Sequence, residues 1–242
     1  MTPIISQDCF DVEGINTNAG LVSWLPYRAL RNSCIAEGLL AAGAILYVKT
    51  SSSQALLMVE SINNIFGTVK NPRNLKLSVG GSSGGEGALL AAKGSILGSG
   101  TDGGGSLRFP AAFCGVCKSI HLHQMTRLCP SPSGRLQVLI GALGSFKPSK
   151  ERMPGRGVSG PRSGSESVNA GLGPLAKTVA GLELWLRAQL EIEPWNEIPG
   201  CLPMPWNFTE AQRCTKKLTV GVILDDGIVQ PTPPVTVCLR AV

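Results

Sequence analysis

Serine and glycine are concentrated in two clusters between positions 80 and 110, which read GGSSGGEGALLAAKGSILGSGTDGGGSLRFP. Glycine has no Cβ, so consecutive backbone N–H groups can converge on a ligand from angles that other residues block. A serine in such a loop can attack a carbonyl carbon while neighbouring N–H groups stabilise the oxyanion that forms. The composition of this stretch therefore favours acyl-transfer chemistry.

Two other interpretations of the same stretch are weaker. Gly/Ser-rich linkers are usually flexible, whereas here short apolar runs alternate with the glycine clusters. The glycines at 98, 100 and 103 spell GxGxxG, but a dinucleotide loop should open a helix and precede an acidic residue by about 20 positions. Pro110 follows, and no Asp or Glu lies between positions 102 and 151. Neither the linker nor the dinucleotide loop is favoured.

The elements that must position these residues alternate between helix and strand. Apolar residues have helical spacing at 28–43, 86–93 and 175–190. Short apolar runs typical of buried strands are found at 44–48, 95–99 and 218–224. Gly43 is placed to end the first helix. This order predicts an α/β architecture in which helices cover a sheet.

Two segments break the alternation. Residues 118–163 hold eight Lys or Arg against one acidic residue, and residues 194–210 are rich in proline and tryptophan. A basic segment can bind nucleic acid, but Phe146 is the one aromatic residue among these charges. Solvated loops are the better interpretation of both segments, and no nucleic-acid partner is expected.

Length and composition limit the class of protein. A chain of 242 residues with 43% hydrophobic residues can bury a sizeable core. No apolar run approaches the roughly 20 residues of a membrane span, and no signal peptide is recognisable. A soluble, cytoplasmic protein with reduced cysteines is therefore expected.

The two glycine-serine clusters, GGSSGGEGA at 80–88 and GTDGGGSLRFP at 100–110, are followed by Cys114-Gly115. In this order and spacing they resemble the amidase signature family, which includes fatty-acid amide hydrolases and fungal acetamidases. Weaker similarity is found in DCFDVEG at 8–14, VKT at 48–50, NPRN at 71–74, FKPS at 146–149 and LGPLAKT at 172–178. The resemblance implies an α/β fold with a mixed, twisted sheet covered by helices.

The resemblance also implies the roles of the site residues. Ser106 would be the nucleophile that forms the acyl-enzyme, and Ser82, following a cis peptide bond, would relay a proton. The backbone N–H groups of Gly103, Gly104, Gly105 and Ser106 would form the oxyanion hole. In the family a neutral lysine starts the proton transfer, and no metal or organic cofactor takes part.

That lysine is replaced in this chain. The family has it in a P-x-x-x-K-[DE] context, and here PIISQD at 3–8 puts Gln7 at its position. A carboxamide is not a base near neutral pH, and general base catalysis is typically worth about 10²–10⁴-fold. A severely impaired rate is expected unless another group substitutes. Neither Lys49 nor Lys93 belongs to a family motif that would make it a base.

Two departures concern length. Residues 118–145 interrupt the family pattern, and family members are much longer, so residues 1–242 are expected to form a single partial domain of a truncated member. An artefact of the gene model is one explanation for the interruption. The segment also creates a metal-like spacing, Cys114-x₂-Cys117-x₃-His121-x-His123-x₅-Cys129. Ordinary thiols and loop histidines are the favoured interpretation, and no metal is expected.

The sequence thus predicts a hydrolase that cleaves a carboxamide C–N bond through a serine acyl-enzyme. The alternative is a catalytically inactive relative that binds an amide or acyl ligand. The expected partner is a small amide. The length of its acyl part and the oligomeric state, a homodimer being one option, are not readable from the sequence.

Overall fold

A computed structural model describes residues 2–115, 144–149, 151–161, 167–168, 170–205 and 223–240. The chain divides into two units, Met1–Ala211 and Gln212–Val242. The described part of the second unit contains helix α7, Pro233–Arg240. All further elements belong to the first unit. No helix among the described residues has both the length and the apolar character needed to cross a bilayer.

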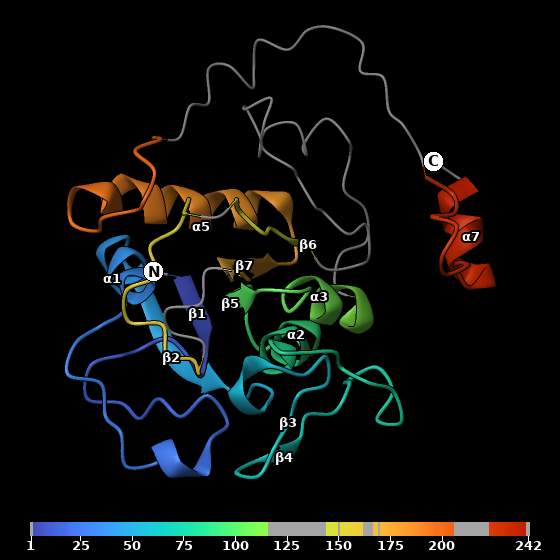
Figure 1. The fold of residues 1–242 in the computed structure, drawn as a ribbon, viewed down its shortest axis with the longest axis horizontal. Coiled ribbons are helices and arrows are strands. Elements are labelled where there is room, and N and C mark those ends of the chain that lie inside the picture. Colours follow the sequence, from blue (N-terminus) through green and yellow to red (C-terminus); the bar gives the residue numbers. More distant parts are fainter. Residues whose placement is uncertain are drawn as a thin grey trace, which may run out of the picture. The chain divides into compact units, whose positions relative to one another are not determined.

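A five-stranded sheet with the order β2-β1-β5-β7-β6 forms the centre of the first unit (Figure 1). The strands are β1 Thr2–Gln7, β2 Ala44–Thr50, β5 Leu97–Asp102, β6 Gly144–Ser145 and β7 Gly171–Ala176. β1 is parallel to both β2 and β5, whereas β7 is antiparallel to β5 and β6. The predicted mixed sheet is confirmed.

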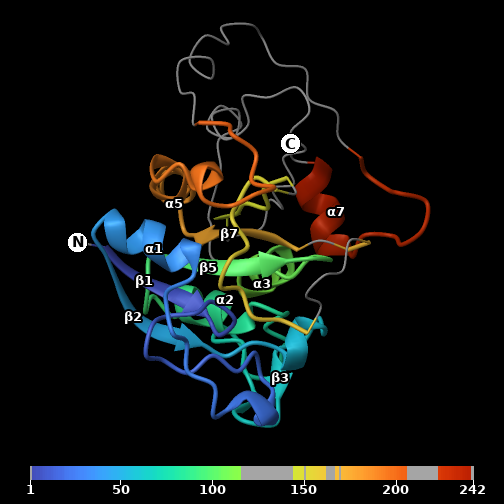
Figure 2. The ribbon, with the colours of Figure 1, turned by 60° about the vertical axis from the view of Figure 1, so that its left-hand side comes forward.

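Helices cover both faces of this sheet (Figures 1 and 2). One layer contains α1, Cys34–Ala41, and α5, Val179–Glu191; the other contains α2, Gly84–Ala91, and α3, Arg108–Cys114. Neighbouring side chains of a strand point to opposite faces. Ile4 of β1 accordingly packs in the α1–α5 core and Ile5 in the α2–α3 core. The predicted helix-covered α/β architecture is confirmed.

The smaller elements are short turns of helix and one hairpin. The 3₁₀ helices are Val22–Trp24, Gln54–Leu56 and Pro194–Asn196, and the hairpin pairs β3, Ile62–Asn63, with β4, Gly67–Thr68.

β5 is a buried strand made mostly of small residues. The indole N–H of Trp185 on α5 donates to the Ser99 hydroxyl at 2.8 Å, which joins the helix to the centre of the sheet. On the other face, a Cβ at Gly100 would lie 2.7 Å from the Ser83 Oγ. Gly98 and Gly100 therefore let elements approach the strand closely. They lie inside the strand and not in a phosphate-binding turn.

Several predicted boundaries are wrong. The run at 44–48 is typical of a buried strand, but β2 is an edge strand in which Ile45 and Tyr47 are each 46% exposed. The helix predicted from position 175 begins at Val179, because Leu175 belongs to β7 and Thr178 caps the helix. The helix predicted from position 28 begins only at Cys34.

Other predictions come closer to the structure. Gly43 directly follows the C-cap of α1 and has a φ of +79°. The strand predicted at 95–99 starts at Leu97 and continues to Asp102. Nearly all of the interruption at 118–145 and of the strand expected at 218–224 lies outside the described residues.

Candidate active site

Gln7 is the last residue of β1, and its side chain is fully buried beneath α2. The Nε2 amide donates to the Ser82 hydroxyl at 3.3 Å. The Oε1 oxygen accepts from the Ser83 hydroxyl at 2.9 Å and from the Thr101 N–H at 3.0 Å and hydroxyl at 3.2 Å. Gln7 therefore links the strand to both glycine-serine clusters.

Ser82 lies in the tight turn before α2, and the Gly81–Ser82 peptide bond is cis, as the resemblance implies. The single hydrogen of the Ser61 hydroxyl is shared between the carbonyl oxygens of Gly80 at 2.9 Å and Ser82 at 3.2 Å. The same hydroxyl accepts from the Gly84 N–H at 2.9 Å. A second segment of the chain therefore fixes both sides of this turn.

Ser106 lies in the loop between β5 and α3, next to the turn that carries Ser82. The Ser83 N–H donates to the Ser106 carbonyl oxygen at 3.2 Å. This bond brings the two glycine-serine clusters together, as the resemblance implies for a shared site. No hydrogen bond joins the Ser82 and Ser106 hydroxyls among the described residues.

Asp102 fixes the loop that carries Ser106. Its carboxylate accepts from the N–H groups of Gly105 at 2.7 Å and Leu107 at 3.2 Å, and from the Arg108 guanidinium at 2.9 Å. Burial acts against the charged form, but the Arg108 hydrogen bonds and charge together with the loop N–H groups lower the pKa of Asp102 below its ordinary value. An ionised Asp102 thus holds the loop in one conformation.

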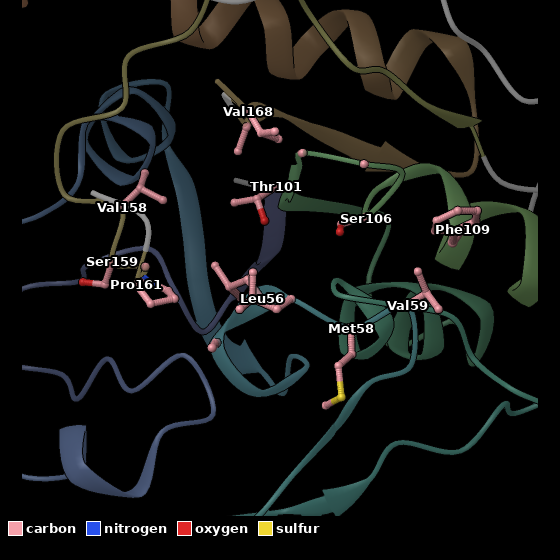
Figure 3. Close-up of a pocket in the computed structure, with 16 residues that line it drawn as sticks. Leu56, Met58, Val59, Thr101, Ser106, Phe109, Val158, Ser159, Pro161 and Val168 are labelled. Carbon is pink, nitrogen blue, oxygen red and sulfur yellow. The ribbon is translucent and has the colours of Figure 1, made fainter. Parts of the chain in front are cut away.

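A pocket of about 350 Å³ opens beside Ser106 (Figure 3). In Figure 3, Val168 lies on one side of this pocket, Leu56 and Met58 lie opposite, and Thr101 and Ser106 lie between them. The lining is predominantly apolar. It is formed by residues 55–59, Thr101, Gly103, Gly104, Ser106, Phe109, 158–161, Val168 and Ala170.

No lysine or carboxylate contacts Ser82 or Ser106 among the residues that the structure describes. The Lys49 ammonium pairs with Asp8 at 2.7 Å and donates to the Asn16 carbonyl and Thr17 hydroxyl, both at 2.7 Å. Lys93 is exposed just after α2. Neither lysine is hydrogen-bonded to Ser82 or Ser106 within the described ranges.

The possible metal ligands are placed only in part. The Cys114 thiol is buried at the end of α3 and points to the Val79 carbonyl oxygen at 3.6 Å. The other four residues of the spacing, Cys117, His121, His123 and Cys129, lie outside the described residues. Within the described ranges, no three Cys, His, Asp or Glu side chains are grouped as a metal site.

Sequence reasoning did not assign roles to several residues of this site. Thr101 and Asp102 lie within the second motif and Ser83 within the first, so the motifs contained them without indicating their contacts. The pocket walls at 55–59 and 158–161 have no motif at all. Their proximity to Ser106 depends on the fold, and no local pattern could have revealed it.

Comparisons with known proteins agree with this geometry. The family model described as Amidase matches residues 2–117. The sequence is 36% identical to an acetamidase of Aspergillus oryzae over 97% of this chain and 39% of that protein. It is 34% identical to fatty-acid amide hydrolase 1 of Sus scrofa over 96% of this chain and 35% of that protein.

A solved structure titled fatty acid amide hydrolase matches the described fold with a TM-score of 0.78 and 32% sequence identity. That match covers 99% of this chain and 37% of the other chain. The chain therefore spans less than half the length of the relatives it matches.

Proposed function

Because the chain belongs to the amidase signature family, we propose that its site binds a carboxamide and cleaves the C–N bond through an acyl ester on Ser106. The Ser106 Oγ attacks the carbonyl carbon, and Ser82 passes a proton between that oxygen and the leaving amine. Water then hydrolyses the ester and releases the carboxylate. The chemistry needs no metal in this scheme.

The position of Ser106 supports the proposal most directly. Its side chain lines the 350 Å³ pocket, and the loop that carries it is fixed by Asp102. The Gly105 N–H already donates to Asp102. The N–H groups of Gly103, Gly104 and Ser106 are therefore the proposed oxyanion donors. Preorganised donors of this kind are each worth about 10²–10³-fold in rate.

Gln7 sets the limit on this activity. Its Nε2 donates to Ser82 and carries no available lone pair, so the contact positions the hydroxyl without deprotonating it. The loss of a general base lowers rates by about 10²–10⁴-fold. We therefore propose a slow hydrolase in which Gln7 occupies the position of the base but does not act as one.

The surroundings of Gln7 are suited to an uncharged amine. Its side chain is completely buried, and it faces the Ser82 hydroxyl through Nε2. A neutral lysine amine has one lone pair, which at this position would be directed to Ser82 as a base. Burial also disfavours the charged form of a lysine. A Gln7→Lys variant should therefore gain a base.

A second candidate function is binding without turnover. The same contact favours it, because Gln7 uses its amide donor on Ser82 and its oxygen on three other donors. Such a site would hold an amide or acyl group in the pocket beside a serine that is not activated.

Labelling with a fluorophosphonate separates the two candidates. We expect slow covalent labelling of the wild-type chain at Ser106 and labelling faster by about 10²-fold or more in Gln7→Lys. Tryptic mass spectrometry locates the adduct. Ser106→Ala is the matched control, because it removes one oxygen atom and leaves the loop intact.

Three results would contradict the proposal in different ways. Labelling that persists in Ser106→Ala assigns the nucleophile elsewhere. A rate that does not change in Gln7→Lys removes the argument about the base. If neither the wild type nor Gln7→Lys is labelled, while isothermal titration still detects ligand binding, the binding function is favoured.

A further inference from the structure

Glu86 is an acidic side chain that the proposed chemistry does not use. It lies in the first turn of α2, four residues after Ser82, and is completely buried. Its Oε1 accepts from the Thr50 hydroxyl at 2.5 Å. Its Oε2 has no hydrogen-bond partner of normal geometry among the described residues. A fully buried carboxyl group without an ion-pair partner is rare.

No cation compensates Glu86 within the described part of the chain. The titratable groups on the segments around α2 are Asp8, Cys9, Tyr47, Lys49, Glu60, Asp102, Arg108 and Cys114. Lys49 pairs with Asp8, and Arg108 pairs with Asp102. Burial raises the pKa of Glu86 to about 8, against the opposing effects of the Thr50 hydroxyl and of the nearby Ser99 N–H, which does not reach normal hydrogen-bond geometry. Glu86 is therefore largely uncharged at neutral pH.

The location of Glu86 connects three elements of the site. Thr50 is the register partner of Gln7 in the β1–β2 pair, so the Glu86–Thr50 bond ends beside the strand that carries Gln7. On the other side, a Cβ at Gly98 of β5 would lie 2.0 Å from Oε2. The absence of a side chain at Gly98 is what makes room for the carboxyl group.

The turn that carries Ser82 depends on the same contact region. Next to Glu86, the Gly85 N–H donates to the Ser51 carbonyl oxygen at 3.1 Å. The first turn of α2 is thus attached to the end of β2 by one backbone bond and one side-chain bond. Movement of this turn would alter the 3.3 Å contact between Gln7 and Ser82.

We propose that Glu86 is a positioning residue, which as an uncharged acid attaches the first turn of α2 to the end of β2 and so keeps Ser82 against Gln7. Ionisation places an uncompensated negative charge between β2 and β5. Buried charges without partners are strongly unfavourable. The turn then moves to hydrate the carboxylate, and the alignment of Ser82 is lost. This role rests on the proposed function of Ser82 and Ser106.

The test compares Glu86→Gln with Glu86→Ala in the full wild-type chain, which retains Gln7. Glutamine has the shape of the acid and is uncharged at every pH, so it should retain fluorophosphonate labelling at pH 7. Alanine loses the attachment, and a displacement of about 1 Å in a catalytic site can cost 10²-fold. Glu183→Gln is the matched control, because Glu183 forms an i,i+4 ion pair with Arg187 on α5.

The pH dependence distinguishes positioning from a general structural effect. The ratio of the wild-type labelling rate to that of Glu86→Gln should be near unity at pH 7 and about tenfold or more lower at pH 9.5. At that pH less than about a tenth of a group with a pKa near 8 is uncharged. An equal decline in both proteins, or a Glu86→Gln rate at pH 7 as low as that of Glu86→Ala, overturns the proposal.

Hydrogen exchange keeps the test independent of catalysis. Three N–H groups of the turn report on it, since those of Ser83, Gly84 and Gly85 are all hydrogen-bonded. Their protection from exchange, corrected for intrinsic rates, should fall between pH 7 and 9.5 in the wild type and persist in Glu86→Gln. If no variant labels Ser106, the proposed function fails, and this measurement alone decides the role of Glu86. Equal protection in both proteins at pH 9.5 would refute it.

Discussion

At the scale of single residues, the central feature of the site is that Gln7 contacts the serines without being able to deprotonate them. The Ser106 loop has its glycines and the ionised Asp102 that holds them. Ser82 has a partner in Gln7, but that partner donates a hydrogen bond and cannot accept the proton. Ser82 therefore has a buried hydrogen-bond partner that is not a base.

The lack of a basic group on Gln7 should make hydrolysis depend strongly on the leaving group. An amide nitrogen must be protonated as it leaves, whereas a nitrophenolate leaves without a proton. The quantity to compare is the rate of nitrophenyl ester hydrolysis divided by the rate for the matched nitroanilide. We expect this ratio to be about 10²-fold or more higher in the wild type than in Gln7→Lys. Steady-state rates at 400 nm and 410 nm measure both reactions, and Ser106→Ala gives the background. Equal ester-to-anilide ratios in the two proteins would show that Gln7 does not limit protonation of the leaving group.

At the scale of elements, the site depends on how closely α2 approaches the end of β2. A Cβ on Gly85 would lie 2.4 Å from the Ser51 carbonyl oxygen and 2.8 Å from the Ser51 nitrogen. These are backbone atoms that cannot rotate away. Glycine is therefore needed at Gly85 because of this approach, and the helix tolerates it in its first turn.

Gly85→Ala tests which of two effects is larger. Alanine favours helix by up to about 1 kcal/mol over glycine, but overpacking typically costs about 1–3 kcal/mol. We expect a net loss of stability in urea unfolding and slower labelling of Ser106, because the turn carrying Ser82 is pushed away from β2. Gly155→Ala is the control, since a Cβ there meets nothing within 4 Å. A Gly85→Ala protein at least as stable as wild type would contradict the close approach.

At the scale of the whole molecule, the pocket combines segments that are distant in sequence. Residues 55–59 and 158–161 line the pocket together with the serine loop. Both are attached to the segment after β1. Val158 forms a bridge with Phe10. The Ala55 N–H donates to the Ala19 carbonyl oxygen, and the Ala19 N–H donates to the Asp8 carbonyl oxygen. The first unit thus assembles a pocket although the chain spans only 39% of the length of the acetamidase it matches.

The stability of this unit should depend on pH in two opposite ways. Glu86 has a raised pKa of about 8, so its contribution is full below the ordinary value of 4.5 and is lost as pH rises toward 8. Asp102 has a lowered pKa, so its contribution is present above 3.8 and is lost as pH falls through the folded-state value. Stability should therefore be highest in mildly acidic solution.

Urea unfolding followed by tryptophan fluorescence between pH 3 and 9 measures this profile. In Glu86→Gln the free energy of unfolding should decline less above pH 5, by a few kcal/mol, because each pH unit of differential ionisation corresponds to about 1.4 kcal/mol. Asp102→Asn should flatten the acid side and lower stability at neutral pH. A decline between pH 5 and 8 that is identical in Glu86→Gln and wild type would assign it to other groups.

The comparison of sequence and structure separates local from long-range information. The helix-covered α/β class followed from alternating apolar patterns, because burial on one face of a helix or on both faces of a strand leaves a local signature. Gly43 marked the end of α1 for the same kind of reason. The boundary at 175–179 failed because Leu175 and Ala176 are apolar in either element, and only pairing with β5 assigns them to β7.

The chemical groups of the proposed site could be read from the sequence: two glycine-serine motifs, a nucleophile candidate in Ser106 and the glutamine at position 7. Residue types and short spacings are properties of the chain, so they need no fold to be recognised. The contacts required the folded structure: Gln7 against Ser82, Asp102 holding the serine loop, and Glu86 buried between β2 and β5. These contacts join residues from separate strands and helices, and packing creates both their distances and the burial that raises the pKa of Glu86.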